Sequence, residues 1–134
     1  MNPTEMLIES QSLFGFDKTV ELIHEAVTIK EWRMPALHDL QQTLRNTGKE
    51  ILPVKVFEIC KPEFSGRILE LDAERIVSTL MPCRISVYER ADGKTYISRM
   101  NSALLGKSFG GIIEEVMNAS GKEIEEIIES VIKK

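Results

Sequence analysis

The segment from residue 83 to residue 100 constrains the fold most, because it has the pattern of a β-hairpin. Its two arms are Cys83–Arg90 and Lys94–Met100. Between them, Ala91-Asp92-Gly93 supplies an Asp-Gly pair, which tolerates the positive φ angles of a tight hairpin. Side chains alternate across a strand, so Cys83 points to the same side as Ile85. That side is mostly apolar, and we expect Cys83 to face the core.

Further strands are expected on both sides of this hairpin. The strongest is Val54–Cys60, which is rich in β-branched and apolar residues and is bracketed by Pro53 and Pro62. Both of its faces are partly apolar, which predicts a central strand. Weaker patterns predict two more strands, the second at an edge or with a bulge because it contains a proline. These segments are Glu5–Phe14 and Trp32–Leu37.

Helical spacing of apolar residues accounts for most of the remaining chain. Asp17 and Asp39 are predicted N-caps of the first two helices. Near the C-terminus, Ser120 and Glu123 have the spacing of a capping box, which predicts that one helix ends and another begins there. The predicted helices cover Lys18–Lys30, Asp39–Asn46, Glu63–Leu71, Ala73–Leu80 and the C-terminal region. Helices with one apolar stripe need a sheet to lie on. The sequence therefore predicts a two-layer α+β sandwich, a mostly antiparallel sheet of four or five strands backed by helices.

Length and charge limit the class of protein. With 134 residues, the chain is expected to form a single domain over residues 1–134, with a helical extension at about 120–134. The net charge of -4 argues against non-specific binding to nucleic acid. No apolar run is long enough to cross a membrane, and no secretory leader is recognisable. With only two cysteines, Cys60 and Cys83, the expectation is a cytoplasmic protein with reduced thiols and no membrane partner.

Short sequence words along most of the chain, up to about Met117, are similar in order and spacing to those of a known family. They are Phe16-Asp17-Lys18-Thr19-Val20, Trp32-Arg33-Met34-Pro35, Leu52-Pro53-Val54-Lys55-Val56, Glu58-Ile59-Cys60-Lys61-Pro62, Met81-Pro82-Cys83-Arg84-Ile85-Ser86-Val87-Tyr88-Glu89, Asp92-Gly93-Lys94-Thr95-Tyr96-Ile97-Ser98 and Met100-Asn101. In this arrangement they resemble the domain-of-unknown-function family 302. The resemblance implies a compact α/β domain of TATA-binding-protein-like topology, often paired into dimers, with no established activity. Lys61 departs from the family, where Asn is common before the proline, and this affects only the shape of that loop.

The residues with most chemical promise are Cys60, Cys83 and His38. Cys60 ends one predicted strand and Cys83 begins another, so antiparallel pairing of the two strands would bring both thiols to one end of the sheet. If the helix Asp39–Asn46 is a crossover, the strands on either side of it run parallel. His38 would then reach the same end as Cys60.

Two thiolates and an imidazole suit zinc or copper, because these ions bind sulfur and nitrogen. Met34 and Met81 would add thioether ligands for Cu(I). The alternative is structural, because free cysteine often fills a core as a small hydrophobic residue. The positions 38, 60 and 83 also match no known metal-binding motif.

Two carboxylates, Glu58 and Glu89, alternate with apolar neighbours and are expected to point inward. A buried carboxylate has a raised pKa and can serve as a general acid or base. The alternative for these glutamates, which we favour, is a salt bridge with Arg84, Arg99 or Lys55, since buried charges are usually paired.

Three hypotheses follow for function. The first is a non-enzymatic homodimer that binds a small ligand or metal ion near the two cysteines, with His38, Glu58, Cys60, Met81, Cys83 and Glu89 as candidate ligand-binding residues. The second is a thiol-dependent enzyme that uses Cys83 or Cys60, with His38 or Glu58 as base. The third is an interaction domain that pairs through its isoleucine-rich C-terminal stripe.

Overall fold

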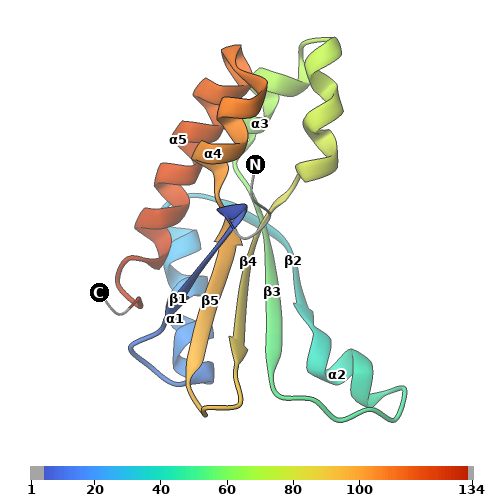
Figure 1. The fold of residues 1–134 in the computed structure, drawn as a ribbon, viewed down its shortest axis with the longest axis vertical. Helices are drawn as coiled ribbons and strands as arrows, with labels where there is room; N and C mark the ends of the chain where they lie inside the picture. The colour runs from blue at the N-terminus through green and yellow to red at the C-terminus, as the bar shows by residue number, and fades with distance from the viewer. Residues whose placement is uncertain (1–4, 133–134) are drawn as a thin grey trace.

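The computed structural model describes residues 5–132 and contains one five-stranded sheet (Figure 1). The strands are β1 (Leu7–Gln11), β2 (Arg33–Asp39), β3 (Val54–Cys60), β4 (Cys83–Glu89) and β5 (Thr95–Met100). Their order is β1-β5-β4-β3-β2, and every neighbouring pair is antiparallel. The predicted hairpin is confirmed as β4 and β5, and Gly93 has a φ of 78° in its turn. The predicted α+β class with an antiparallel sheet is therefore confirmed.

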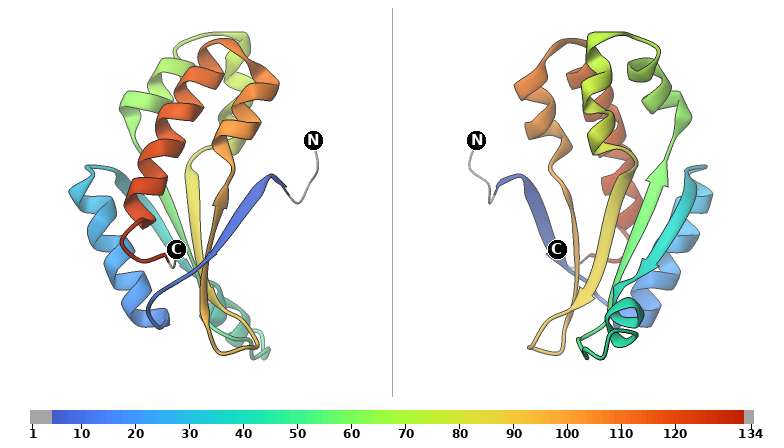
Figure 2. Two further views of the ribbon diagram at one scale, coloured as in Figure 1. Left: turned by 60° about the vertical axis from the view of Figure 1, so that its left-hand side comes forward. Right: turned by 90° about the vertical axis from the view of Figure 1, so that its right-hand side faces the viewer.

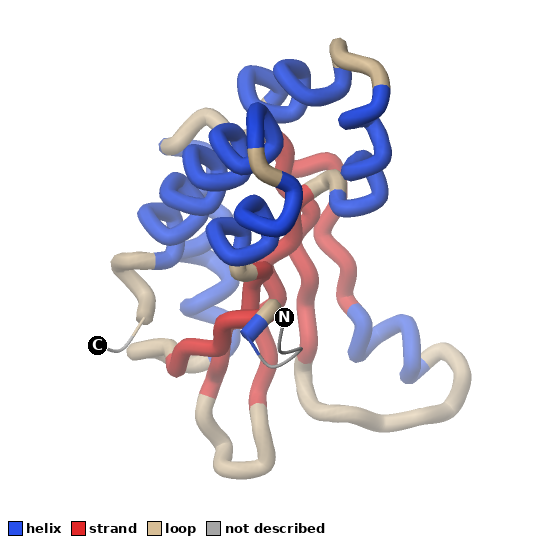
Figure 3. Tube along the Cα trace, turned by 45° about the horizontal axis from the view of Figure 1, so that its top comes forward, coloured by secondary structure: helices blue, strands red, loops and turns tan. Residues whose placement is uncertain are grey.

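The helices form a layer on one face of this sheet and a cluster at one end of it (Figures 2 and 3). They are α1 (Phe16–Ile29), α2 (Leu40–Arg45), α3 (Pro62–Leu69), the 3-10 helix η2 (Ala73–Leu80), α4 (Ser102–Phe109) and α5 (Gly111–Ile128). Figure 2 shows α1 and α5 side by side on the covered face. In Figure 1, α3, η2 and α4 gather at the upper end of the strands, and α2 lies at the lower end.

The core lies between the sheet and the two covering helices. On the covered face, Phe57 is opposite Ile85, and Val87 is opposite Ile97, and all four are fully buried. The helices contribute a matching apolar set, which consists of Ile23, Val27, Ile124, Ile127 and Ile128. A smaller second cluster at the upper end consists of Ile68, Val77, Ile113 and Val116. Burial of these apolar stripes is what holds the helices on the sheet.

The chain between β2 and β3 does not form the crossover that we considered. The two strands are antiparallel, with His38 opposite Val56 and Asp39 opposite Lys55. The helix α2 has six residues and rises only about 9 Å. A seven-residue strand such as β2 is about 23 Å long. Because α2 is too short to return the chain along the sheet, it serves as part of a long turn. Asp39 caps α2 as predicted, since its carboxylate accepts a hydrogen bond from the Gln42 amide at 3.0 Å.

The C-terminal region differs from the predicted pair of helices. The helix α5 runs without a break through Ser120, whose hydroxyl donates to the Met117 carbonyl at 3.3 Å, so the predicted capping box is wrong. The predicted extension is therefore the second half of α5, and its last residues, 133–134, lie outside the described residues, as do residues 1–4 at the other end. A helix that was not predicted, α4, precedes α5 and is capped by Asn101.

At the N-terminal side, Asp17 is not the cap of α1. The helix begins at Phe16, two residues before the predicted start, with Gly15 at the N-cap position and Asp17 in the first turn. The hydroxyl of Thr19 instead donates to the Gly15 carbonyl at 2.7 Å and contacts the Ser12 hydroxyl at 2.6 Å. This buried pair of hydroxyls fixes the start of α1 against the end of β1. Between residues 5 and 132, no helix combines the length and the apolar character needed to span a bilayer.

Candidate functional site

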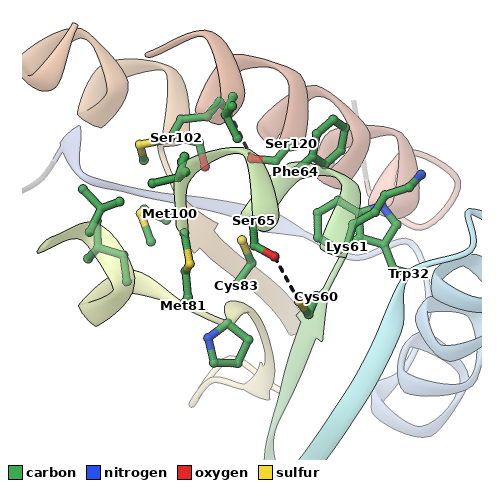
Figure 4. Close-up of a pocket in the computed structure, with 16 residues that line it drawn as sticks. Trp32, Cys60, Lys61, Phe64, Ser65, Met81, Cys83, Met100, Ser102 and Ser120 are labelled. Carbon is green, nitrogen blue, oxygen red and sulfur yellow. Dashed lines mark hydrogen bonds between the residues drawn. The ribbon is translucent and has the colours of Figure 1, made fainter. Parts of the chain in front are cut away.

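A small cavity at the upper end of the sheet carries most of the sulfur in the chain. Its volume is about 70 Å³. Both cysteines and three of the six methionines line it, namely Cys60, Cys83, Met81, Met100 and Met117. We call it the sulfur-lined cavity. Figure 4 shows Cys60, Cys83, Met81 and Met100 at this end of the sheet, below the segments that carry Ser102 and Ser120.

Sheet topology explains why the two cysteines lie at the same end of the sheet. Cys60 is the last residue of β3, and Cys83 is the first residue of the neighbouring antiparallel strand β4. The register places Cys83 opposite Ile59, one residue from Cys60. The expectation that antiparallel pairing brings both cysteines to one end of the sheet is confirmed. Cys83 also packs against the main core, as the alternation along its strand predicted.

The methionines reach the cavity from three different segments. Met81 lies in the short link between η2 and β4, and Met100 ends β5, the strand next to β4. Met117 comes from α5, which lies over this end of the sheet. Met81 was among the candidate residues, whereas Met100 and Met117 were missed. The hairpin register provided a signal for Met100, since it brings the end of β5 beside the start of β4. No sequence pattern indicated where α5 would dock, and so none indicated Met117.

Apart from the sulfur atoms, the lining is mainly apolar. The aromatic rings of Trp32 and Phe64 lie at one side, with their centroids 6.0 Å apart. The Ser65 hydroxyl lies 3.7 Å from the Cys60 sulfur, which is within hydrogen-bonding distance for a thiol. Lys61 also lines the cavity, but its ammonium group is paired with Glu123 at 2.7 Å. The site therefore offers soft sulfur ligands in surroundings that are poor in free charge.

Burial decides the protonation state of Cys83. Burial in this apolar environment, together with the charge of Cys60, raises the pKa of the Cys83 thiol to about 11. At neutral pH, Cys83 is therefore a thiol and not a thiolate. Because the thiolate is the nucleophilic form, this environment does not activate Cys83 for covalent chemistry.

The remaining predicted site residues lie elsewhere. His38 is opposite Val56, four residues and about 13 Å along the strand from Cys60. The idea that His38 shares an end of the sheet with the cysteines is wrong, because it required parallel strands around α2. His38 instead lies 2.5 Å from Glu58, measured from Nε2 to Oε2, on the face of the sheet opposite α1 and α5. Within residues 5–132, no group of three or more His, Cys, Asp and Glu side chains is arranged to hold a metal ion.

The two candidate carboxylates, Glu58 and Glu89, lie away from the sulfur-lined cavity. Glu58 is paired with His38 and also lies 3.6 Å from Arg84, so the salt-bridge interpretation of Glu58 is confirmed. The hydrogen bond from His38 holds the pKa of Glu58 below its ordinary value, which is the opposite of the raised pKa of a buried general acid. Glu89 pairs with Thr95 at the far end of β4, away from Cys83. Met34, the other candidate thioether, packs against the main core.

The fold and the cavity define a small α+β protein with a five-stranded antiparallel sheet and a sulfur-lined cavity at one end. The family model described as "Domain of unknown function DUF302" matches residues 8–133, and the chain belongs to that family. The resemblance to family 302 inferred from the sequence words is thereby confirmed.

A solved structure supports the same fold. The chain is similar to an uncharacterized conserved protein DUF302 from Bacillus stearothermophilus, with a TM-score of 0.80 and 19% sequence identity. The alignment covers 92% of this chain and 96% of that one. At this identity the likeness establishes the fold alone. A comparison with curated proteins finds no match.

Proposed function

We propose that the protein is a non-enzymatic binding module that holds one soft monovalent metal ion, of the chemistry of Cu(I), in the sulfur-lined cavity. The observation that carries the proposal is the convergence of two thiols and three thioethers on one cavity of about 70 Å³. These five side chains come from segments that are far apart in the sequence. Soft thiolate and thioether ligands favour Cu(I) over harder cations.

The ligand set favours copper over zinc. Structural zinc sites use four ligands drawn from Cys, His, Asp and Glu. Here Cys60 and Cys83 have no such third partner within the described residues, and thioethers are soft ligands suited to Cu(I). The zinc alternative therefore has less support than the copper alternative.

Size favours a single ion over an organic molecule. An engineered apolar cavity that binds benzene has a volume of about 150 Å³. The sulfur-lined cavity has about half that volume, which suits an ion surrounded by its sulfur ligands.

Charge balance also suits a monovalent ion. Isolated charge in an apolar environment is costly, and the raised pKa of Cys83 expresses that cost. One thiolate and one monovalent cation together are neutral, and thioethers such as Met81 and Met100 add ligands without adding charge. Binding then replaces the thiol proton with the metal ion, as is usual for cysteine ligands.

The two alternative functions receive less support. A thiol-dependent enzyme needs an activated thiolate and a base within reach. Cys83 is held as a thiol, and His38 and Glu58 are paired with each other on the open side of the sheet. An interaction domain that pairs through the C-terminal isoleucines is also disfavoured, because Ile124, Ile127 and Ile128 are buried in the core of the chain itself.

The test is an anaerobic titration with Cu(I) in the presence of a chromophoric Cu(I) chelator. We expect the wild-type protein to take up one equivalent and the Cys60→Ser/Cys83→Ser double variant to take up none. Met100→Leu keeps both thiols and should weaken binding about tenfold or more, since it removes one ligand from the cavity. Met34→Leu is the matched control, because this methionine lies outside the cavity, and it should bind as the wild type does.

Two outcomes would contradict the proposal. One is the absence of stoichiometric uptake by the wild type. The other is unchanged affinity in Met100→Leu, since the two thiols alone would then explain the binding. A parallel titration with Zn(II) distinguishes a general thiol site from a soft-metal site, and we expect Zn(II) to bind more weakly than Cu(I).

A further inference from the structure

A second hollow lies on the face of the sheet that α1 and α5 leave uncovered. It has a volume of about 450 Å³. We call it the open-face groove. Its lining includes Leu80, Arg84, Ser86, Ser98, Met100 and Leu105. The proposed metal site does not use this groove, although the two share Leu80, Met81, Pro82 and Met100 as a common wall.

Small side chains on the central strands create the hollow. On the open face, Ser86 of β4 is directly opposite Ser98 of β5 on one side and Val56 of β3 on the other. Larger residues surround these short side chains, with Leu80 of η2 and Leu105 of α4 as walls at the upper end. The groove therefore has a polar floor of hydroxyl groups and apolar walls.

One cation lining the groove is available to a ligand. Of the two arginines there, Arg99 is buried and makes a two-pronged ion pair with Glu125, with nitrogen–oxygen distances of 2.6 and 2.8 Å. Arg84 is different, because its side chain is 65% exposed and its one ion pair among the described residues, with Glu58, is long at 3.6 Å. Arg84 is two residues from Ser86 on the same face of β4.

The acidic groups nearby are already paired. Glu58 has His38 as a second and closer partner, at 2.5 Å, so it keeps a hydrogen bond if Arg84 turns to a ligand. Glu9, which is opposite Ser98, is held by the Tyr88 hydroxyl and by Arg90. The carboxylates near Arg84 therefore already have partners of their own when an anionic ligand binds there.

We propose that the open-face groove binds a small amphipathic carboxylate, with its head group on Arg84 and Ser86 and its apolar chain along Leu80, Met100 and Leu105. The guanidinium group of arginine matches a carboxylate with two parallel hydrogen bonds. A volume of about 450 Å³ lies in the range of small-molecule sites, which combine apolar walls with a few polar groups. The proposal does not depend on metal binding.

The test uses octanoate as the probe and octan-1-ol as its uncharged counterpart, with binding followed by NMR titration of labelled protein. We expect octanoate to bind at least about tenfold more tightly than octan-1-ol, with shifts at the Ser86 and Ser98 amides. Arg84→Gln should remove this preference, since charge-assisted hydrogen bonds supply it. Arg67→Gln is the matched control, because Arg67 is a half-exposed arginine on α3 paired with Glu115 and does not line the groove.

Two further variants complete the test. Ser86→Leu fills the floor of the groove and should abolish binding of both probes. The Cys60→Ser/Cys83→Ser double variant should bind octanoate as the wild type does, so failure of the metal proposal and failure of this one are distinguishable. The proposal is overturned if octanoate binds no better than octan-1-ol, if Arg84→Gln keeps the wild-type preference, or if Ser86→Leu still binds octanoate at the groove.

Discussion

At the scale of single residues, burial decides what the cysteines can do. Cys83 begins a strand at the edge of the core, and the desolvation of its thiol raises its pKa to about 11. The same burial that removes nucleophilic character leaves a soft sulfur atom at a cavity that other sulfur-bearing side chains also line. Binding of a soft ion is therefore compatible with this environment, whereas covalent catalysis through Cys83 at neutral pH is not.

Alkylation measures this protonation state directly. In the Cys60→Ser variant, where Cys83 is the one remaining cysteine, we expect iodoacetamide to react about a hundredfold more slowly at neutral pH than it reacts with a free thiol of pKa about 8.5. The rate should rise as the pH approaches the pKa of the buried thiol, which desolvation holds above its ordinary value. Rapid labelling at neutral pH would contradict this expectation and favour the thiol-enzyme hypothesis.

Glu123 is the residue whose charge links three segments. Burial alone would raise its pKa, but hydrogen bonds from Lys61 at 2.7 Å and from the Trp32 indole at 2.9 Å outweigh burial and hold that pKa below its ordinary value. A lowered folded-state pKa means that the charged carboxylate stabilises the fold above the unfolded-state pKa. This stabilisation is lost as the pH falls through the folded-state pKa.

We therefore expect Glu123→Gln to lower the free energy of unfolding by about 1–3 kcal/mol at neutral pH, the range for hydrogen bonds to charged groups. The difference from the wild type should shrink as the pH falls through the lowered folded-state pKa of Glu123, where its side chain becomes uncharged like that of glutamine. Urea denaturation followed by Trp32 fluorescence measures both values. Glu115→Gln, which removes an exposed ion pair with Arg67, is the control and should change stability by less than about 1 kcal/mol. If Glu123→Gln destabilised the protein equally at neutral and acid pH, the stabilisation would not come from the charge of Glu123.

At the scale of elements, close contact between α4 and α5 shapes the upper end of the molecule. A Cβ atom added at Gly121 of α5 would lie 2.9 Å from the Ser102 Cβ of α4, and one added at Gly106 of α4 would lie 3.2 Å from the Glu114 Cα of α5. These glycines let the two helices pack closely, which sets where Met117 meets the cavity. Glycine is unfavourable inside a helix, but at these two positions its lack of a side chain allows the close packing.

Replacing Gly121 tests this contact. We expect Gly121→Ala to destabilise the protein by about 1–3 kcal/mol, the usual cost of overpacking. Gly66→Ala is the matched control, because Gly66 is also in a helix and a Cβ there meets no atom within 4 Å. It should stabilise the protein by about 0.5–1 kcal/mol through helix propensity and chain entropy. Thermal unfolding of both variants gives the comparison, and equal effects would contradict the close-packing interpretation.

At the scale of the whole molecule, the last helix completes the core. Ile124, Ile127, Ile128 and Val131 are buried against the main sheet and α1. The backbone of Leu13 also donates a hydrogen bond to the Val131 carbonyl at 2.7 Å, which joins the two ends of the described chain. The C-terminal stripe is thus part of the fold of one chain.

A chain truncated after Ala119 is expected to lose cooperative folding. Each large apolar side chain removed from a core costs about 2–5 kcal/mol, whereas domains have a total stability of about 5–15 kcal/mol. Circular dichroism during heating measures the loss, and Ile127→Ala should fold with a reduced melting temperature. A truncated chain that still unfolds cooperatively would show that this helix segment is dispensable.

We also expect the full chain to be a homodimer, as the family resemblance implies. The strands β1 and β2 are the edges of the sheet, and edges and open faces are the usual places for association between copies. Sedimentation equilibrium should give about twice the mass of one chain, which is 15.2 kDa. A single-chain mass across the concentration range would contradict this expectation.

The strands, most helices and the placement of the two cysteines at one end of the sheet followed from local patterns. The Asp-Gly turn fixes the register of β4 and β5, and antiparallel pairing of β3 with β4 places Cys60 at the same end of the sheet as Cys83. The sequence words also identified the family. These features depend on residues close in sequence or on the pairing of two strands. They could therefore be predicted from the amino-acid sequence alone.

The tertiary structure decided the rest. The direction of β3 relative to β2 depended on the length of α2, which separated His38 from the cysteines. The close packing of α5 on α4 depended on a glycine at the contact, and this docking brought Met117 to the cavity. Such contacts join residues far apart in the chain, and no local periodicity encodes them. The sequence alone therefore determined most of the elements and the family, whereas packing between elements determined which sulfur-bearing side chains share one cavity.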